Sequence, residues 1–246
     1  MAVYITILLS VMLVSTIGQN YSEKKDIYLG YRLERRSVPP VAITLVICAI
    51  LIFFFAARWY VGTDFGAYFS RFYDLLGMSI SELIGTRDWG FYVFTAFIGK
   101  YVFTDFFLYS LILGAIIYIP VIMTYRKYSN SFTMTCALYI MMCLYTWPYN
   151  GMRQAVAVSL LFMGFPLLYE KKNWWKYILV VAIAYTFHST AIMVVPFILL
   201  CRLKPWKKPF VFICIIIAIL IIFKCCLYFW TVLMIIHCSF IRPAII

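Results

Sequence analysis

The chain has 246 residues, of which 65% are hydrophobic and 12% are charged, and its formal net charge is +12. Soluble domains average about 45–50% apolar and about 25% charged residues, so the composition excludes an ordinary soluble domain and indicates a multi-pass membrane protein. The positive charge does not require nucleic acid, because cytoplasmic loops of membrane proteins collect Lys and Arg. We therefore expect membrane lipid, and no nucleic acid, among its partners.

The first part of the chain contains two apolar runs separated by a basic loop. The first run, about 2–18, lacks the basic start and small-residue cleavage site of a signal peptide, so we expect a first membrane helix. The loop 19–40 is rich in Lys and Arg and ends in a Pro-Pro pair, which cannot continue a helix. The second run, about 41–57, predicts a second span, and a polar segment over 58–88 follows it.

An amphipathic pattern lies within that polar segment. Aromatic and leucine side chains recur over 65–77 at helical spacing, and small or polar side chains fill the other face. This predicts an external helix lying in the membrane interface. Thr63 or Asp64 is its natural N-cap, and Gly77 suits its C-terminal end.

The stretch from 89 to 125 is too long for one crossing, which needs about 20 residues. It also contains Lys100 and Asp105. We therefore divide it into a short helix over about 89–102, which dips into the membrane or lies at its interface, and a span over about 104–124.

Further apolar runs follow at about 131–147, 152–169 and 177–201. Basic loops flank the last of these on both sides, so a single crossing would leave one basic loop outside the cell. A re-entrant hairpin that bends near 187–190 avoids this, because irregular backbone is tolerated where protein buries it or a wet cavity borders it. A single tilted span is the alternative.

These runs predict an all-α, polytopic transmembrane helical bundle of about seven membrane segments in a single integral membrane domain over 1–246. The N-terminus is expected outside the cell. The segments 58–88 and 148–153 contain a smaller proportion of Lys and Arg than the other loops, so they are expected on the same external side. The segment 209–246 is apolar but poorly patterned, and we treat it as atypical.

Arg58, Thr63 and Asp64 directly follow the second span, in "RWYVGTDFGAY". One interpretation is an interface anchor followed by a helix cap. The other is a carboxylate held at the outer membrane edge beside a guanidinium, which is half of an active site.

Arg153 lies in "YNGMRQ", where Asn150 is a plausible N-cap and Arg153 would fall in the first helical turn. A cation is usually disfavoured there, because the helix dipole already leaves that end positive. A helix N-terminus with an arginine makes an anion site, and Gln154 is beside it. The alternative is an arginine that extends its head group to the interface.

His188 lies in "FHST", inside an apolar run. Ionisable groups at membrane depth are more often functional than in soluble proteins, although a hydrogen-bonded core histidine is the alternative. Asp88 and Lys100 can be explained as the ends of the short helix. The eight cysteines lie in apolar runs without metal-ligand spacing, and nucleotide motifs are absent, so we expect no cofactor and no metal.

Four motifs in this order resemble the EpsG-like family, a Wzy-type group of membrane polysaccharide polymerases: "R-x-x-x-G-T-D-x-x-x-Y" (58–68), "DWGFYVFTAFIGK" (88–100), "N-G-M-R-Q-A-x-A" (150–157) and "F-H-S-T-A" (187–191). The resemblance covers about 41–205. The family usually has Glu-Pro where this chain has Asp88-Trp89. It also usually continues for several more spans, so a truncated, a divergent and an inactive chain are alternative interpretations.

The resemblance implies a membrane glycosyltransferase of the bacterial cytoplasmic membrane. Such an enzyme joins oligosaccharide units carried on polyprenyl pyrophosphate into an exopolysaccharide, capsule or O-antigen chain at the outer face, with other export or assembly proteins as partners. The reaction needs a base for the attacking hydroxyl and cations for the leaving pyrophosphate. The expected bases are Asp64 and His188. The expected substrate-binding residues are Arg58, Thr63, Tyr68, Arg153 and Gln154.

Other functions use similar residues. A transporter or flippase of a lipid-linked saccharide would move the anion through the same basic cavity, but the sequence contains no inverted repeat. A membrane acyltransferase would need its donor site facing inward. A non-catalytic assembly subunit is a fourth hypothesis.

Overall fold

The computed structural model describes residues 2–29, 32–169, 174–200, 211–212, 215–216 and 219. The chain divides into two compact units, Met1–Val195 and Pro196–Ile246, and each is considered by itself. Most of the atypical C-terminal segment, with its cysteines, lies outside the described residues.

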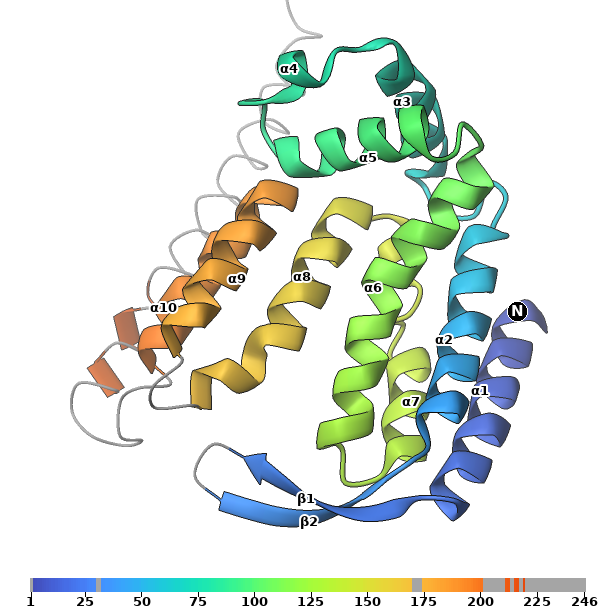
Figure 1. Ribbon diagram of the computed structural model, residues 1–246, viewed down its shortest axis with the longest axis vertical. Helices are drawn as coiled ribbons and strands as arrows, with labels where there is room; N and C mark the ends of the chain where they lie inside the picture. The colour runs from blue at the N-terminus through green and yellow to red at the C-terminus, as the bar shows by residue number, and fades with distance from the viewer. Residues whose placement is uncertain are drawn as a thin grey trace, which may run out of the picture. The chain divides into compact units, whose positions relative to one another are not determined.

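Helices make up most of the first unit, as the sequence predicted, and six of them run side by side (Figure 1). They are α1 (Ala2–Asn20), α2 (Val41–Ala56), α6 (Phe106–Tyr128), α7 (Phe132–Met141), α8 (Met152–Gly164) and α9 (Trp174–Phe187). Helix α6 packs against α2 and α8, α8 packs against α9, and α1 packs against α2 and α7.

Two of these helices, α1 and α6, are long and apolar enough to cross a membrane. The other four are apolar but shorter. Membrane-type helices are therefore present, whereas the expected count of about seven membrane segments is not confirmed in the described part of the chain.

Three further helices, α3 (Phe65–Gly77), α4 (Ile80–Leu83) and α5 (Trp89–Tyr101), lie together at one end of the bundle (Figure 1). Helix α3 has the bounds predicted from its amphipathic pattern, and Asp64 is its N-cap residue, although its side chain makes no capping hydrogen bond. The division of 89–125 is confirmed as well. The chain leaves α5, and Asp105 then caps α6 by accepting a hydrogen bond from the Leu108 amide at 2.9 Å.

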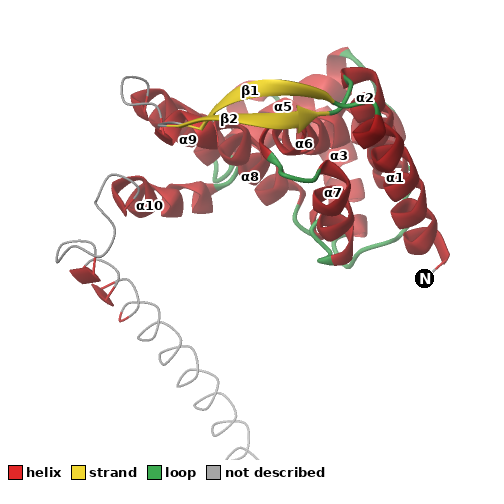
Figure 2. Ribbon diagram, turned by 90° about the horizontal axis from the view of Figure 1, so that it is seen from below, coloured by secondary structure: helices red, strands yellow, loops and turns green. Residues whose placement is uncertain are grey.

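A β-hairpin lies at the opposite end, where the sequence predicted only a loop. Strands β1 (Glu23–Leu29) and β2 (Arg32–Val38) pair antiparallel. The hairpin crosses the ends of the helices (Figure 2). Arg36 of β2 donates a hydrogen bond to the Tyr128 carbonyl at the end of α6, and Arg126 of α6 donates one to the Pro39 carbonyl, directly after β2, at 2.8 Å.

The predicted span over 131–147 is shorter than expected, since α7 ends at Met141. Cys143 adopts a left-handed backbone (φ 59°), and the chain continues through the 3₁₀ turn η1 (Trp147–Tyr149). Buried tyrosine hydroxyls accompany this irregular segment. Tyr118 donates to the Tyr145 carbonyl at 2.9 Å, which supplies a partner that helical backbone would otherwise provide.

The predicted break near 187–190 is present. Helix α9 ends at Phe187, His188 is extended, and η3 (Ser189–Val194) follows, leading into α10 (Val195–Leu200). The span predicted over 152–169 consists of α8 followed by the 3₁₀ turn η2 (Phe165–Tyr169).

Candidate functional site

The carboxylate of Asp88 joins three segments that are far apart in the sequence. Its oxygen Oδ2 lies 3.1 Å from Arg153 Nη1 and 3.2 Å from His188 Nδ1. Its other oxygen accepts a hydrogen bond from the Ser189 backbone amide at 2.8 Å. The Asp88 side chain is only 2% exposed, so these donors replace the water that a buried carboxylate loses.

Backbone geometry at the start of α5 places this carboxylate. Asp88 precedes the helix in a left-handed conformation (φ 59°), which is uncommon for residues other than glycine but is found more often for Asp. Tyr92 follows one helical turn later, on the same face of α5. Its hydroxyl accepts a hydrogen bond from Arg153 Nη1 at 3.0 Å, so α5 supplies two partners to one guanidinium.

Arg153 lies in the first turn of α8, as the sequence predicted, but the N-cap residue is Gly151 and not Asn150. The positive end of the helix therefore adds to the charge of the guanidinium. Asp88 offsets part of that charge, and the side chain is still 34% exposed.

His188 lies where α9 has ended and η3 has not begun, so its backbone is free to direct the ring toward α5. When Nδ1 carries the proton and donates it to Asp88, Nε2 has no proton and can accept one. A carboxylate that fixes the orientation and tautomer of a histidine in this way prepares it as a base.

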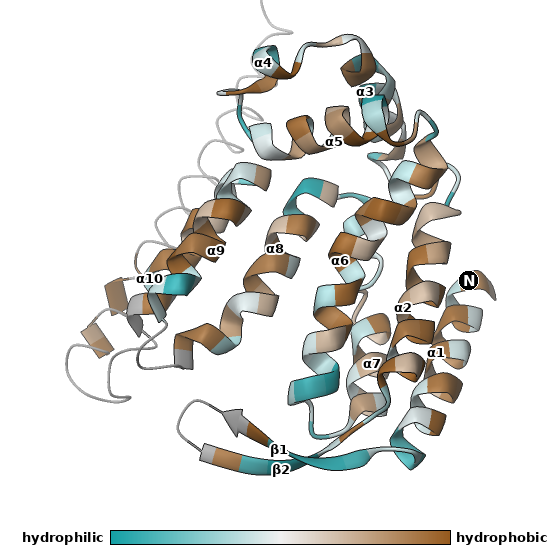
Figure 3. Cartoon of the chain, viewed as in Figure 1, coloured by the Kyte–Doolittle hydropathy of each residue, from teal (hydrophilic) through white to brown (hydrophobic). Residues whose placement is uncertain are grey.

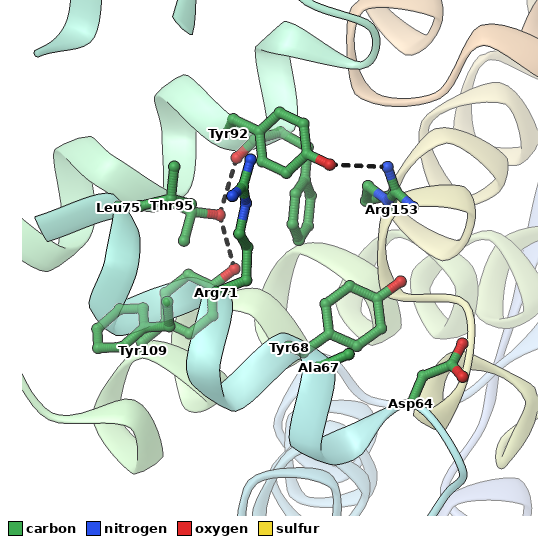
Figure 4. Close-up of a pocket in the computed structure, with 11 residues that line it drawn as sticks. Asp64, Ala67, Tyr68, Arg71, Leu75, Tyr92, Thr95, Tyr109 and Arg153 are labelled. Carbon is green, nitrogen blue, oxygen red and sulfur yellow. Dashed lines mark hydrogen bonds between the residues drawn. The ribbon is translucent and has the colours of Figure 1, made fainter. Parts of the chain in front are cut away.

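A cavity of about 300 Å³ lies beside this cluster (Figure 4). Helix α3 contributes Asp64, Tyr68 and Arg71 to its wall, α5 contributes Tyr92, and α8 contributes Arg153. The Tyr68 phenol points toward the side of the cavity where Arg153 lies, and Asp64 lies below it in this view. The structure therefore brings together three predicted site residues, Asp64, Tyr68 and Arg153, in the cavity wall. His188 and Asp88 do not line the cavity, and Asp88 links His188 to Arg153.

Two other predicted residues are close to the cavity without lining it. The Thr63 hydroxyl lies 3.3 Å from Asn150 Oδ1, so it links the loop before α3 to the loop before α8. Gly62 allows this approach, because it has φ 101° and a Cβ there would lie 2.7 Å from Asn150 Oδ1. Gln154 follows Arg153 on α8 but is not among the cavity-lining residues.

Arg58 is buried and does not line the cavity. Its guanidinium carbon lies 3.9 Å from the ring centroid of Phe55 and 4.9 Å from that of Tyr149, and Nη1 donates to the Phe55 carbonyl. Among the described residues, none accepts a hydrogen bond from Nε or Nη2. Burial lowers the pKa of Arg58. Its position connects α2 to the loop before α8 and gives a substrate no direct access.

The sequence analysis missed Asp88, Tyr92 and Arg71. One feature of the sequence pointed to Asp88, because it stands where the family that the chain resembles usually has a glutamate. We nevertheless explained Asp88 as the end of a helix. Tyr92 lies in the motif 88–100, but nothing distinguished it from the other aromatic residues there. Arg71 had no signal, because it belongs to the polar face of a predicted interfacial helix.

Chemically, the site combines an anion-binding part and a proton-accepting part. Arg71 and Arg153 place positive charge in the cavity wall, and Asp64 and the His188–Asp88 pair are acceptors for a proton. Asp64 is exposed, and within the described ranges no cation pairs with it.

Comparison with protein families identifies a match to the EpsG family over residues 41–242. The match begins where the resemblance begins and extends beyond residue 205, where we placed its end. No curated protein matches the chain, and no solved structure does. The family match covers well over half of the sequence. The apolar helices of the chain are consistent with a membrane protein. The chain is thus a membrane protein that belongs to the EpsG family.

Proposed function

We propose that this protein joins oligosaccharide units carried on polyprenyl pyrophosphate into a longer polysaccharide at the outer face of the bacterial cytoplasmic membrane. The observation that carries the proposal is the Asp88 carboxylate, which holds Arg153 and His188 together beside a cavity that also contains Asp64. The family match supports the polysaccharide substrate class.

The reaction assigns one task to each part of the site. A base, His188 Nε2 or the Asp64 carboxylate, takes the proton of an acceptor sugar hydroxyl. The hydroxyl oxygen then bonds to the anomeric carbon of the donor unit, and the bond from that carbon to the pyrophosphate oxygen breaks. The bonding electrons leave with polyprenyl pyrophosphate, and Arg153 stabilises the negative charge that develops on it.

The position of the site in the bundle supports an outer location. The cavity lies at the end of α8 that is opposite to the β-hairpin, and Figure 3 shows hydrophilic residues along the hairpin and at the start of α8. The hairpin and the end of α6 carry Lys and Arg, which predicts that their end faces the cytoplasm.

Reconstitution tests this function directly. The full chain in lipid vesicles would receive a polyprenyl-pyrophosphate-linked oligosaccharide, and polymer length and released polyprenyl pyrophosphate would both be measured. Loss of one preorganised charge-stabilising contact costs about 100- to 1,000-fold in rate, so we expect Arg153→Lys to reduce both products by about that factor. Nη1 of Arg153 contacts both Asp88 and Tyr92, which leaves the other guanidinium N–H groups for the pyrophosphate, whereas the donors of a lysine all belong to one nitrogen.

Arg35→Lys on the exposed hairpin is the matched control, and we expect it to behave as the unaltered protein does. Polymer of normal length and rate from Arg153→Lys would contradict the proposal. Movement of the lipid-linked oligosaccharide across the vesicle membrane without either product would identify a flippase instead.

A further inference from the structure

Tyr92 lies between two guanidinium groups from different helices. The guanidinium carbon of Arg71, on α3, is 5.1 Å from the centre of the Tyr92 ring, and that of Arg153, on α8, is 5.7 Å away. Figure 4 shows Arg71 and Arg153 on the two sides of Tyr92, and both side chains line the cavity. One aromatic ring on α5 therefore positions two cations around one space.

The two arginines differ in their partners. Arg153 donates hydrogen bonds to Asp88 and to the Tyr92 hydroxyl. Arg71 is exposed, and no carboxylate in the described part of the chain pairs with it. Contact with the face of a ring orients a guanidinium without occupying its N–H donors, so the donors of Arg71 remain available for a ligand.

The two arginines of the cavity wall also differ in how their charges are compensated. Asp88 forms an ion pair with Arg153, and Asp64 also lies in the wall. Among the described residues no carboxylate forms an ion pair with Arg71, so Arg71 is the arginine of the cavity wall whose charge is not offset by a direct contact. A guanidinium with free donors suits bidentate binding of a phosphate group, and a pyrophosphate presents two phosphate groups where a monophosphate presents one.

We propose that Arg71 binds one phosphate group of a polyprenyl pyrophosphate while Arg153 binds the other, so that Arg71 makes the site selective for pyrophosphate over monophosphate. The assignment of a lipid donor as the ligand rests on the proposed function. The second cation of the site is accordingly Arg71 and not Arg58, whose guanidinium is buried against the Phe55 ring and does not line the cavity.

Equilibrium binding to the full chain in detergent micelles tests this, with geranylgeranyl pyrophosphate, geranylgeranyl monophosphate and inorganic pyrophosphate as probes. We expect the unaltered protein to bind the lipid pyrophosphate most tightly. Hydrogen bonds to charged groups contribute enough for about a 10- to 100-fold effect, so Arg71→Gln should weaken lipid pyrophosphate binding by about that factor. Lipid monophosphate binding should change by less than about threefold, which removes the selectivity.

Controls separate a binding role from a structural one. Arg71→Lys keeps the charge and should retain part of the selectivity, and Arg35→Gln should leave all three affinities unchanged. Equal weakening of both lipids by Arg71→Gln would indicate a purely structural role and overturn the inference, as would unchanged selectivity. Inorganic pyrophosphate that binds as tightly as the lipid form would overturn the assignment to a membrane donor.

The binding experiment on Arg71 and the polymerisation experiment can fail independently. Selective binding that depends on Arg71 supports the inference even when the vesicles make no polymer. Polymer formation by the unaltered protein, together with unchanged selectivity in Arg71→Gln, supports the function and overturns the inference.

Discussion

At the scale of single residues, the site depends on a carboxylate that is 65 residues from one partner and 100 from the other in the sequence. Asp88 is buried, and a buried charge is stable only when it is paired and hydrogen-bonded. Arg153, His188 and the Ser189 amide provide those partners together. Removal of the Asp88 carboxylate is therefore expected to abolish the ion pair with Arg153 and to release the His188 ring from its orientation at the same time.

Asp88→Asn tests that dependence. The amide keeps the size of the side chain but removes the charge that balances Arg153 and fixes His188, so we expect polymer formation to fall by about 100-fold or more. Asp88→Glu is the matched variant, because glutamate retains the charge and stands at this place in the resembling family. We expect it to retain more activity than Asp88→Asn, measured as polymer per amount of inserted protein. Full activity of Asp88→Asn would contradict the role of this residue.

Asp64→Asn tests the second candidate base. Asp64 is exposed and lines the cavity, so its loss should affect the reaction and not the stability of the protein. We expect a decrease of about 100-fold in polymer formation with unchanged protein abundance. Asp74→Asn is the control, since Asp74 is exposed on the same helix but does not line the cavity. Equal behaviour of the two variants would remove Asp64 from the reaction.

The sequence revealed some of these residues because their charge is unusual for their surroundings. Arg153 occupies a positive helix end, and His188 interrupts an apolar run, so each was visible alone. The importance of Asp88 comes from its partners, and contacts over such sequence distances cannot be read from one sequence. Burial also decides roles, as Arg58 shows: its position after a span is visible in the sequence, but the aromatic rings around its guanidinium are not.

At the scale of elements, the close contact between α5 and α9 positions the site. Gly90 at the start of α5 packs against the last turn of α9, and a Cβ there would lie 2.9 Å from the carbonyl carbon of Thr186. Asp88 precedes this contact on one side, and His188 follows it on the other. The glycine therefore sets the separation of the carboxylate and the imidazole.

Gly90→Ala should push the two helices apart, because the added Cβ would meet the Thr186 hydroxyl and would lie 2.7 Å from the Thr186 Cβ and 2.9 Å from its carbonyl carbon, and the last two atoms cannot rotate away. Forcing a methyl group into a packed contact costs about 1–3 kcal/mol, so we expect lower thermal stability together with at least about a tenfold loss of polymer formation. Gly77→Ala is the control, since a Cβ at that position meets nothing within 4 Å. A fully active and equally stable Gly90→Ala variant would show that this contact is not required.

Prediction of the elements from sequence followed the strength of their patterns. The amphipathic helix 65–77 was predicted with its bounds, because its period is clear and its ends carry residues typical of helix ends. The hairpin was missed because charged residues dominate both strands, which leaves no apolar alternation. The early end of α7 was missed because the apolar run continues beyond Met141 without a glycine or proline.

At the scale of the whole first unit, the bundle has two different polar ends. The basic hairpin lies at one end, and α3, α5 and the start of α8 surround the cavity at the other (Figure 1). The distribution of Lys and Arg predicts that the hairpin faces the cytoplasm and that the cavity faces outward. A polymerase that receives lipid-linked units at the outer face requires this orientation.

Cysteine labelling in intact spheroplasts with a membrane-impermeant maleimide tests the orientation most directly. The background is Cys143→Ser, because Cys143 is the exposed cysteine of the described residues, and Asp64→Cys and Arg35→Cys are introduced separately. We predict that Asp64→Cys reacts in intact spheroplasts and that Arg35→Cys reacts only after permeabilisation. Reaction of Arg35→Cys from outside, with Asp64→Cys protected until the membrane is opened, would contradict a polymerase site at the outer face.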